Sequence, residues 1–238
     1  MTIIESNKND NNIETSARFS VAPMMDWTDR HCRYFHRQFT KKSLLYTEMI
    51  AAAALVQGKA YHLLDYSSEE HPVALQLGGS DPIQLAEAAS IGESYGYDEI
   101  NLNVGCPSDR VQSGSFGAVL MKNPRLVGAC CEAMKKNTSI DVTVKCRIGV
   151  DDQDPGETLS GFLSHICNSG VRRVIIHARK AILKGLSPKE NRDVPPLDYE
   201  IVYKMKEKFP NLHISLNGGV TSINTAKDLL GRGIDGIM

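Results

Sequence analysis

The sequence lacks the features that mark membrane-spanning, secreted or zinc-binding proteins. Among its 238 residues, no apolar run approaches the length needed to cross a bilayer, and the polar N-terminal stretch contains no hydrophobic segment of the kind that a secretory signal needs. Its six cysteines include no Cys-x-x-Cys pair, and no histidine spacing completes a zinc site. We therefore expect a monomeric, cytoplasmic protein that binds no metal.

An excess of charge of one sign is also missing. The 27 lysines and arginines and the 28 aspartates and glutamates leave a formal net charge of −1, so any contact with RNA must come from a local basic patch. With 42% hydrophobic and 23% charged residues, the composition is that of a globular protein with a buried core. We expect a polar, disordered tail at residues 1–16 and one domain at residues 17–238.

Short strand-like segments alternate with segments of helical period. Strands are expected at Phe19–Ala22, Leu44–Thr47, Val73–Leu77, Glu99–Asn103, Val142–Cys146, Arg173–Ile176, His213–Leu216 and Ile234–Met238. Helices are expected from a cap at Asp26 or Thr28 to Gln38, and at residues 82–95, 124–136, 155–168, 197–208 and 222–230. This alternation indicates a parallel sheet with helical crossovers, and eight strands favour a TIM (β/α)8 barrel over an open sheet.

The last expected strand reaches Met238, and no eighth helix follows it in the sequence. A TIM barrel ends on a helix and usually runs to about 250 residues. We therefore expect a barrel that is truncated at its C-terminus.

Polar, cationic and glycine residues follow the expected strands. In a TIM barrel the active site lies at the carboxyl ends of the strands, so these residues are expected to converge on one rim. The candidates are Pro23, Met24, Met25, Gln76, Asn103, Cys106, Lys145, Arg147, His177, Asn217, Gly218 and Gly219. Together they suit a flat, anionic cofactor, because glycines allow close backbone approach and a helix N-terminus suits a phosphate.

Several of these residues also have structural interpretations when taken singly. Gln76 can cap a strand end, His177 can be a loop histidine with its own partner, and Asn217-Gly218-Gly219 can be a tight turn before a helix. Lys145 favours function, because a buried ammonium at the tip of an apolar strand needs a partner.

Cys106 lies between Gly105 and Pro107 in the loop that leaves the fourth strand. It is either a small buried residue or an acid or nucleophile. A free thiol has a pKa of about 8.5 and stays mostly protonated at neutral pH, which suits a proton donor.

Several motifs, in this order, resemble those of tRNA-dihydrouridine synthases, and in particular the A-type bacterial subfamily that acts on uridines 20 and 20a of the tRNA D-loop. The resemblance extends from about Arg18 to Met238. The matching segments are residues 22–29 (APMMDWTD), 101–113 around Cys106-Pro107-Ser108, 145–149 (KCRIG), 177–179 (HAR), 191–192 (NR) and 217–219 (NGG).

The resemblance implies an FMN-dependent enzyme that uses NADPH to reduce uridine to 5,6-dihydrouridine, with hydride reaching C6 and Cys106 donating the proton to C5. It implies that Pro23, Met24 and Met25 pack on the flavin ring, that Gln76 and Lys145 bind its polar edge, and that His177 and Asn217-Gly218-Gly219 hold the ribityl phosphate. It further implies that Asn103, Lys145, Arg147 and Arg192 face the target base, and that basic residues after the sixth strand contact tRNA.

Two alternatives stay open from the sequence. One is another FMN barrel that acts on a free pyrimidine, such as a dihydroorotate or dihydropyrimidine dehydrogenase. The other is a catalytically inactive RNA-binding fragment.

Overall fold

The computed structural model describes residues 15–109, 111 and 114–238. Residues 1–14 of the expected tail lie outside this part of the chain. Ser16, the last residue of that expected tail, is buried, and its carbonyl accepts a hydrogen bond from the Leu44 amide at 3.2 Å.

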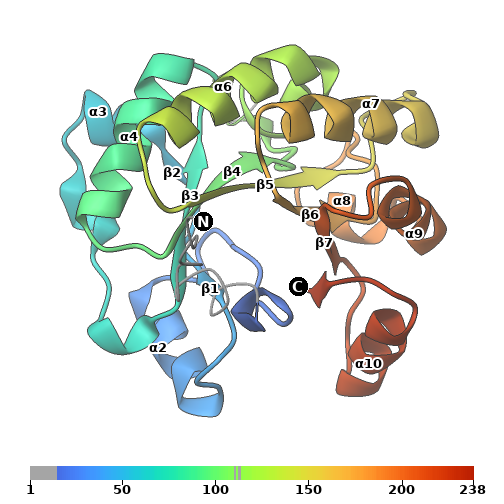
Figure 1. Cartoon of the computed structure of the whole chain (residues 1–238), viewed down its shortest axis with the longest axis horizontal. Helices are drawn as coiled ribbons and strands as arrows, with labels where there is room; N and C mark the ends of the chain where they lie inside the picture. The colour runs from blue at the N-terminus through green and yellow to red at the C-terminus, as the bar shows by residue number, and fades with distance from the viewer. Residues whose placement is uncertain (1–14, 110, 112–113) are drawn as a thin grey trace, which may run out of the picture.

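Strands and helices alternate along the described chain (Figure 1). The strands are β1 (Leu45–Tyr46), β2 (Ile50–Ala51), β3 (Val73–Gly78), β4 (Glu99–Val104), β5 (Asp141–Arg147), β6 (Arg173–His177), β7 (His213–Asn217) and β8 (Gly236–Ile237). The helices are α2 (Arg30–Phe39), α3 (Ala52–Val56), α4 (Pro82–Ser94), α6 (Pro124–Lys136), α7 (Pro155–Asn168), α8 (Glu190–Asp193), α9 (Tyr199–Lys208) and α10 (Ile223–Gly231). Short 3-10 helices are η1 (Tyr61–Leu64), η2 (Ser68–Glu70) and η3 (Gly117–Lys122).

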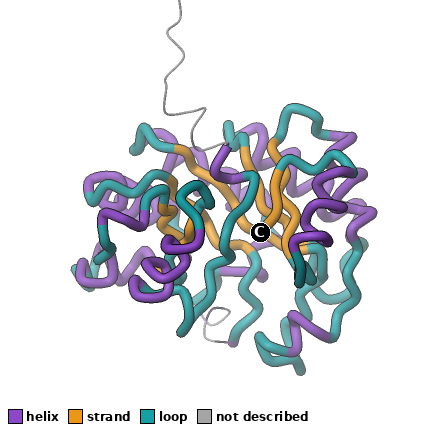
Figure 2. Tube along the Cα trace, turned by 90° about the horizontal axis from the view of Figure 1, so that it is seen from below, coloured by secondary structure: helices purple, strands orange, loops and turns teal. Residues whose placement is uncertain are grey.

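The sheet is parallel throughout and follows the order β1-β3-β4-β5-β6-β7-β8, with β2 beside the end of β3. A short segment joins its two edges, because Phe19 bridges to Ile237 and Ser20 bridges to Leu44. The Ser20 amide donates to the Ile237 carbonyl at 2.9 Å. Figure 2 shows the strands at the centre and the helices around them. This arrangement confirms the expected TIM-barrel-like α/β fold.

Two details of the strands differ from expectation. The first expected strand, Phe19–Ala22, is reduced to the bridges at Phe19 and Ser20 and a hydrogen bond from the Val21 amide to the Leu44 carbonyl at 3.1 Å. Pro23, which follows, has no N–H to extend the pairing. The pair Ile50–Ala51 forms the unexpected β2 against Leu77 and Gly78. Two residues are too short a run to show a strand period in the sequence.

Three helices begin where an Asx-Pro pair predicts. Asp81 accepts from the Ile83 amide at 2.8 Å, Asn123 from the Leu126 amide at 3.2 Å, and Asp154 from the Glu157 amide at 2.9 Å. In each case proline occupies the first turn, where its missing N–H costs no helical bond.

The cap of α2 was predicted wrongly. Asp29 caps this helix by accepting from the Cys32 amide at 2.8 Å. Thr28 cannot serve, because its hydroxyl is bonded to the Met24 amide at 2.9 Å and lies 3.2 Å from the Met24 carbonyl. Asp26 has a left-handed backbone with φ of 63°, and its amide donates to Glu48 at 2.5 Å.

The strands separate an apolar outer layer from a largely polar interior. Successive side chains of a strand point to opposite faces. The outward set, such as Leu75, Ile100, Leu102, Val144 and Ile176, belongs to the large core shared with the helices. A small second apolar cluster lies on the inward face and comprises Ala17, Leu44, Tyr46, Ala74, Ile175 and Met238. Most other inward positions are polar and carry the site described below.

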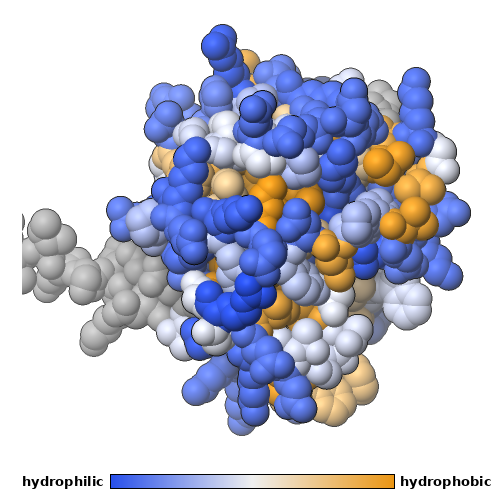
Figure 3. Space-filling model, turned by 90° about the vertical axis from the view of Figure 1, so that its right-hand side faces the viewer, coloured by the Kyte–Doolittle hydropathy of each residue, from blue (hydrophilic) through white to orange (hydrophobic). Residues whose placement is uncertain are grey.

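The outer surface is mainly hydrophilic. Figure 3 shows apolar side chains exposed only in separate patches on the face it presents. Within the described residues, no helix combines the length and apolar character needed to cross a membrane.

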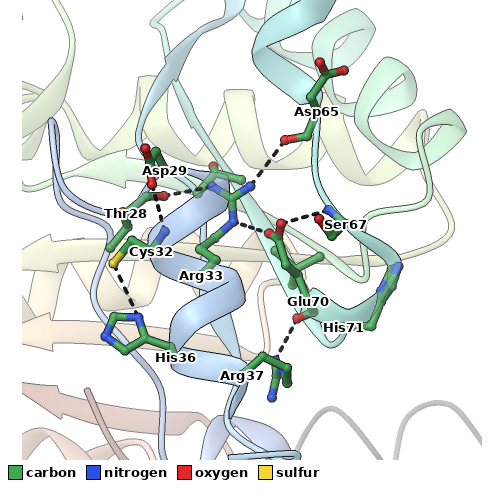
Figure 4. Close-up of polar contacts among 12 residues, drawn as sticks. Thr28, Asp29, Cys32, Arg33, His36, Arg37, Asp65, Ser67, Glu70 and His71 are labelled. Carbon is green, nitrogen blue, oxygen red and sulfur yellow. Dashed lines mark hydrogen bonds and ion pairs between the residues drawn. The ribbon is translucent and has the colours of Figure 1, made fainter. Parts of the chain in front are cut away.

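A buried ion pair anchors α2 (Figure 4). Arg33 donates from Nε to Glu70 at 2.5 Å and from Nη1 to the Thr28 carbonyl at 2.8 Å, and both charged side chains are buried. Arg37, one turn later, donates to the carbonyls of Glu70 at 2.7 Å and Ser43 at 2.9 Å. These bonds join α2 to the segment that follows η1 and hold the end of the loop that carries Met24 and Met25.

We predict that Glu70→Gln lowers the free energy of unfolding by about 3 kcal/mol or more, because it leaves the Arg33 guanidinium buried without a counter-charge. Urea denaturation measures the change. The matched control is Glu132→Gln, which breaks the exposed pair with Lys136 and is expected to leave the midpoint unchanged. Equal midpoints for the two variants would contradict a stabilising role for the buried pair.

Candidate active site

The strand register brings the predicted residues to one end of the barrel. Gln76 pairs with Asn101 in the ladder, Asn103 pairs with Lys145, and Arg147, His177 and Asn217 are successive neighbours. We call this end, formed by the carboxyl ends of β3 to β7 and the loops after them, the mouth. Of the matching segment 101–113, residues 110, 112 and 113 lie outside the described residues.

Side-chain amides form a chain of hydrogen bonds below the mouth. Gln76 donates to Asn101 at 2.8 Å and accepts from Asn103 at 2.8 Å, and all three residues are buried. The Asn103 oxygen accepts from the amides of Gly105 at 3.1 Å and Cys106 at 2.9 Å. Gln76 therefore does more than cap a strand end, because it connects two neighbouring strands through side chains.

Cys106 is half-buried at the start of the loop after β4. Its carbonyl accepts from the Ala118 amide at 2.8 Å, and its sulfur lies 3.6 Å from the Ser108 hydroxyl. The loop crosses the end of β5, where Arg147 Nε donates to the Gly105 carbonyl at 3.2 Å. A thiolate at Cys106 would raise the pKa values of both Lys145 and Arg147, which places the sulfur within electrostatic reach of these cations.

Lys145 projects from β5 into the mouth. Its Nζ donates to Asn217 Oδ1 at 3.0 Å, and Asn217 in turn donates to the Met238 carbonyl at 2.8 Å. Burial first, and then the positive charge of Arg147, lowers the pKa of Lys145 to about 8. The partner expected for the Lys145 ammonium is therefore the uncharged side-chain amide of Asn217.

His177 ends β6 beside the glycine turn. A Cβ placed on Gly218 would lie 3.2 Å from His177 Nε2, so the imidazole packs directly on the glycine backbone. His177 is buried, and its Nδ1 has no hydrogen-bond partner among the described residues. Burial and the positive charges of Arg147, Lys145 and Arg179 lower the pKa of His177 far below its usual range. The imidazole is therefore neutral, with one nitrogen left over for a ligand.

Arg147 fastens the loop that follows β6. Its Nη1 donates to the carbonyls of Asn191 at 2.8 Å and Lys180 at 3.3 Å. Asn191 is fully buried and its side chain bonds to Ile182 in both directions, donating to the carbonyl at 2.9 Å and accepting from the amide at 2.7 Å. This loop carries Arg192, which is exposed.

Four cations converge on the mouth. Lys145, Arg147, Arg179 and Arg192 each lie near enough to His177 to lower its pKa. Within residues 15–109, 111 and 114–238, none of the four forms an ion pair with a carboxylate. A site with several cations and no fixed counter-charge is suited to an anionic ligand.

Exposed methionines lie on the loop before α2. Met24 is 41% exposed, Met25 is 51% exposed and Pro23 is half-buried, so the loop presents apolar surface. The two bonds between Thr28 and the Met24 backbone fix the turn.

Sequence reasoning missed the residues deeper in the barrel. Thr143 bonds Asn101 at 2.8 Å and also donates to Glu99, which pairs with Arg173. The signal was present as polar residues at every second position, 99, 101 and 103 in β4 and 143, 145 and 147 in β5. That period indicates a polar inner face rather than strands buried in apolar surroundings on both sides.

The fold and the mouth define a TIM-barrel-like α/β protein with a cationic ligand site at the carboxyl ends of its strands. Residues 20–238 match the family described as dihydrouridine synthase (Dus). The chain belongs to this family.

Curated relatives share most of the sequence. The chain is similar to the tRNA-dihydrouridine(20/20a) synthases of Salmonella typhi (60% identity over 222 residues), Escherichia coli strain K12 (59% over 227) and Vibrio vulnificus (58% over 224). The alignments cover 93%, 95% and 94% of this chain and 66%, 65% and 68% of the relatives. The chain therefore spans about two thirds of the length of these relatives.

The lowered pKa of Lys145 gives a prediction on amine reactivity. Because only the neutral amine is nucleophilic, the rate of Lys145 acylation should rise with pH around a midpoint near 8, compared with about 10.4 for an unperturbed lysine. Peptide mass spectrometry after brief acylation measures it. Arg147→Gln should move the midpoint upward, since it removes a neighbouring positive charge, and a wild-type midpoint near that of an unperturbed lysine would contradict the burial argument.

The glycine turn gives a second prediction. Gly219 has φ of 70°, and a Cβ there would lie 2.5 Å from Leu197 Cδ1 and 2.8 Å from the Tyr199 hydroxyl oxygen. Gly219→Ala should therefore destabilise the fold by about 2 kcal/mol, from backbone strain and overpacking. The control Gly161→Ala, in an exposed position of α7 with no heavy atom within 4 Å, should instead stabilise by up to about 1 kcal/mol. Urea denaturation of both proteins checks the opposite signs.

Proposed function

We propose that the protein is a flavin-dependent tRNA-dihydrouridine synthase that reduces uridines 20 and 20a of the D-loop to 5,6-dihydrouridine, with FMN as cofactor and NADPH as reductant. The observation that carries the proposal is the shared mouth, which places the Cys106 loop beside Lys145, His177 and Asn217. The names of the relatives, which are 58–60% identical to this chain, support the substrate.

The residues at the mouth fit the phosphate end of FMN. The unpartnered Nδ1 of buried His177 and the four cations without carboxylate partners favour an anionic ligand. Gly218 and Gly219 have left-handed backbones, with φ of 109° and 70°, and a Cβ on Gly219 would collide with Leu197, so glycine is required at this turn beside His177. His177 and Asn217-Gly218-Gly219 would hold the ribityl chain and phosphate.

The remaining residues suit the flavin ring. Pro23, Met24 and Met25 would pack on the ring, and their exposed apolar surface is consistent with this role. Gln76 and Lys145 would bind its polar edge. Once bound, the flavin would supply hydride transfer, taking hydride from NADPH and passing it to C6 of the uracil.

Cys106 would complete the reaction by moving its thiol proton to C5, which leaves a thiolate that solvent reprotonates. Hydride addition at C6 develops negative charge on the uracil C4 oxygen, so donors near that oxygen lower the barrier. Asn103, Arg147 and Arg192 would face the base in this role. Arg147 uses Nε and Nη1 to bind backbone carbonyls, which leaves Nη2 for the substrate.

A uridine inside a folded D-loop cannot reach a buried mouth, so the base must be flipped out of its stack. The loop after β6 supplies Lys180, Lys184, Lys189 and Arg192. We propose that these residues contact tRNA phosphates, which position the RNA without reading its sequence.

We predict that Cys106→Ala retains flavin and its reduction by NADPH but lowers single-turnover reduction of a tRNA transcript by about 10²–10⁴-fold, the usual worth of a positioned acid. Anaerobic reoxidation of the reduced flavin by tRNA measures the rate. The control Cys32→Ala removes a thiol on α2 whose sulfur lies 3.6 Å from His36 Nδ1, and should react like the wild type.

Three results would contradict the proposal. An unchanged rate for Cys106→Ala would show that Cys106 is not the proton donor. Equal reduction of free uracil would favour an oxidoreductase of free pyrimidines, and a colourless protein that binds tRNA without reducing it would favour an RNA-binding role.

A further inference from the structure

A single file of buried side chains leads from the floor of the barrel to the Cys106 loop. Thr143 donates its hydroxyl to Glu99 Oε1, Asn101 Nδ2 donates to the Thr143 oxygen at 2.8 Å, and Gln76 Nε2 donates to Asn101 Oδ1 at 2.8 Å. Asn103 Nδ2 then donates to Gln76 Oε1 at 2.8 Å. We call these five residues the polar column. Each of them is buried.

The floor of the polar column is an ion pair. Arg173 donates to Glu99 Oε2, and Tyr46 donates to Glu99 Oε1 at 2.9 Å. Burial raises the pKa of Glu99, and the charge of Arg173 together with the Thr143 and Tyr46 hydroxyls acts in the opposite direction. The Arg173 guanidinium keeps its charge in proteins. Glu99 and, at 3.8 Å, Asp141 together supply the counter-charge that this buried cation requires.

Both ends of the polar column require the same direction for the hydrogen bonds between them, because the Glu99 carboxylate only accepts and the Gly105 and Cys106 amides only donate to Asn103. An ionised carboxylate only accepts, so the Thr143 hydroxyl must point its proton at Glu99 and can only accept from Asn101. The Asn101 amide must then turn its oxygen to Gln76, and Gln76 must turn its oxygen to Asn103. With the opposite orientation of any one amide, two donors or two acceptors would face each other in a buried site.

Asn103, the last residue of the polar column, is thereby oriented toward the Cys106 loop. Asn103 uses its nitrogen on Gln76, so its oxygen faces the Gly105 and Cys106 amides at 3.1 and 2.9 Å. Two lone pairs are then occupied, and the spare N–H is the only group that Asn103 can offer to a ligand. Asn103 therefore selects a carbonyl or other acceptor, and not a donor, at that point of the mouth.

We propose that Glu99 and Thr143 are positioning residues, which bond at the floor in the direction that the Gly105 and Cys106 amides require at the mouth, and so hold the backbone of the Cys106 loop while keeping Asn103 a hydrogen-bond donor toward the ligand. The inference deepens the proposed function, because it names what would position its proton donor. The orientation of the loop does not itself require a flavin or tRNA.

The test distinguishes an effect of the Thr143 hydroxyl from an effect of the Thr143 side-chain volume. Thr143→Val keeps the shape and removes the hydroxyl, whereas Thr143→Ser keeps the hydroxyl and removes a methyl group. Hydrogen–deuterium exchange at the Gly105 and Cys106 amides reports whether their acceptor is in place, and it needs no substrate. The Ala178 amide, which bonds to the Asn217 carbonyl at 2.9 Å outside the polar column, serves as reference.

We expect Thr143→Val to speed exchange of the Gly105 and Cys106 amides roughly tenfold, as for loss of one backbone hydrogen bond, and Thr143→Ser to restore the wild-type rate. Wild-type rates in Thr143→Val, or equal acceleration in both variants, would overturn the proposal in favour of packing alone. Glu99→Gln, which keeps the volume but adds a donor at the floor, should reproduce the effect, and unchanged loop exchange there would also overturn it. Since Cys106→Ala tests the chemistry and this experiment tests the loop, either idea can fail without the other.

Discussion

The structure depends on one constraint, which is that the polar groups inside the barrel must be hydrogen-bonded to one another. A buried donor or acceptor that lacks a partner destabilises the fold by more than a single hydrogen bond stabilises it. At the floor the Glu99–Arg173 pair meets this demand, and the amides above it meet it in turn. At the mouth, buried His177 Nδ1 has no hydrogen-bond partner among the described residues, and such an atom is one that a ligand can use.

The mouth differs from the floor in its electrostatics. The floor balances Arg173 with Glu99 and Asp141, while the mouth gathers Lys145, Arg147, Arg179 and Arg192 around neutral His177. A charged Lys145 raises the free energy of the protein alone, through burial first and then through repulsion by Arg147, and both effects lower its pKa. An anionic ligand would relieve that repulsion, so the same arrangement that weakens the free protein strengthens binding. A binding site of this kind can therefore be recognised by cations whose counter-charge the protein does not supply.

Much of the fold can be predicted from local sequence, and the predictions that fail do so for a physical reason. The helices after Asp81, Asn123 and Asp154 begin as predicted, because an N-cap and a following proline act within one turn. The candidate residues meet at one mouth because parallel strands share their carboxyl ends. The cap of α2 could not be predicted as Asp29 in place of Asp26 or Thr28, since the choice depends on a turn whose geometry the sequence does not specify.

The polar column shows why a site is harder to predict than a fold. Gln76 and Asn101 are 25 residues apart, and Asn101 and Thr143 are 42 residues apart. No local sequence pattern therefore predicts the hydrogen bonds between their side chains. Each residue alone is an ordinary polar residue in a strand. Their direction is the one that both the Glu99 carboxylate at the floor and the Gly105 and Cys106 amides at the mouth require. The orientation of Asn103 at the mouth therefore depends in part on groups at the floor of the barrel. A change at Glu99 or Thr143 is expected to act on the Cys106 loop without contacting it.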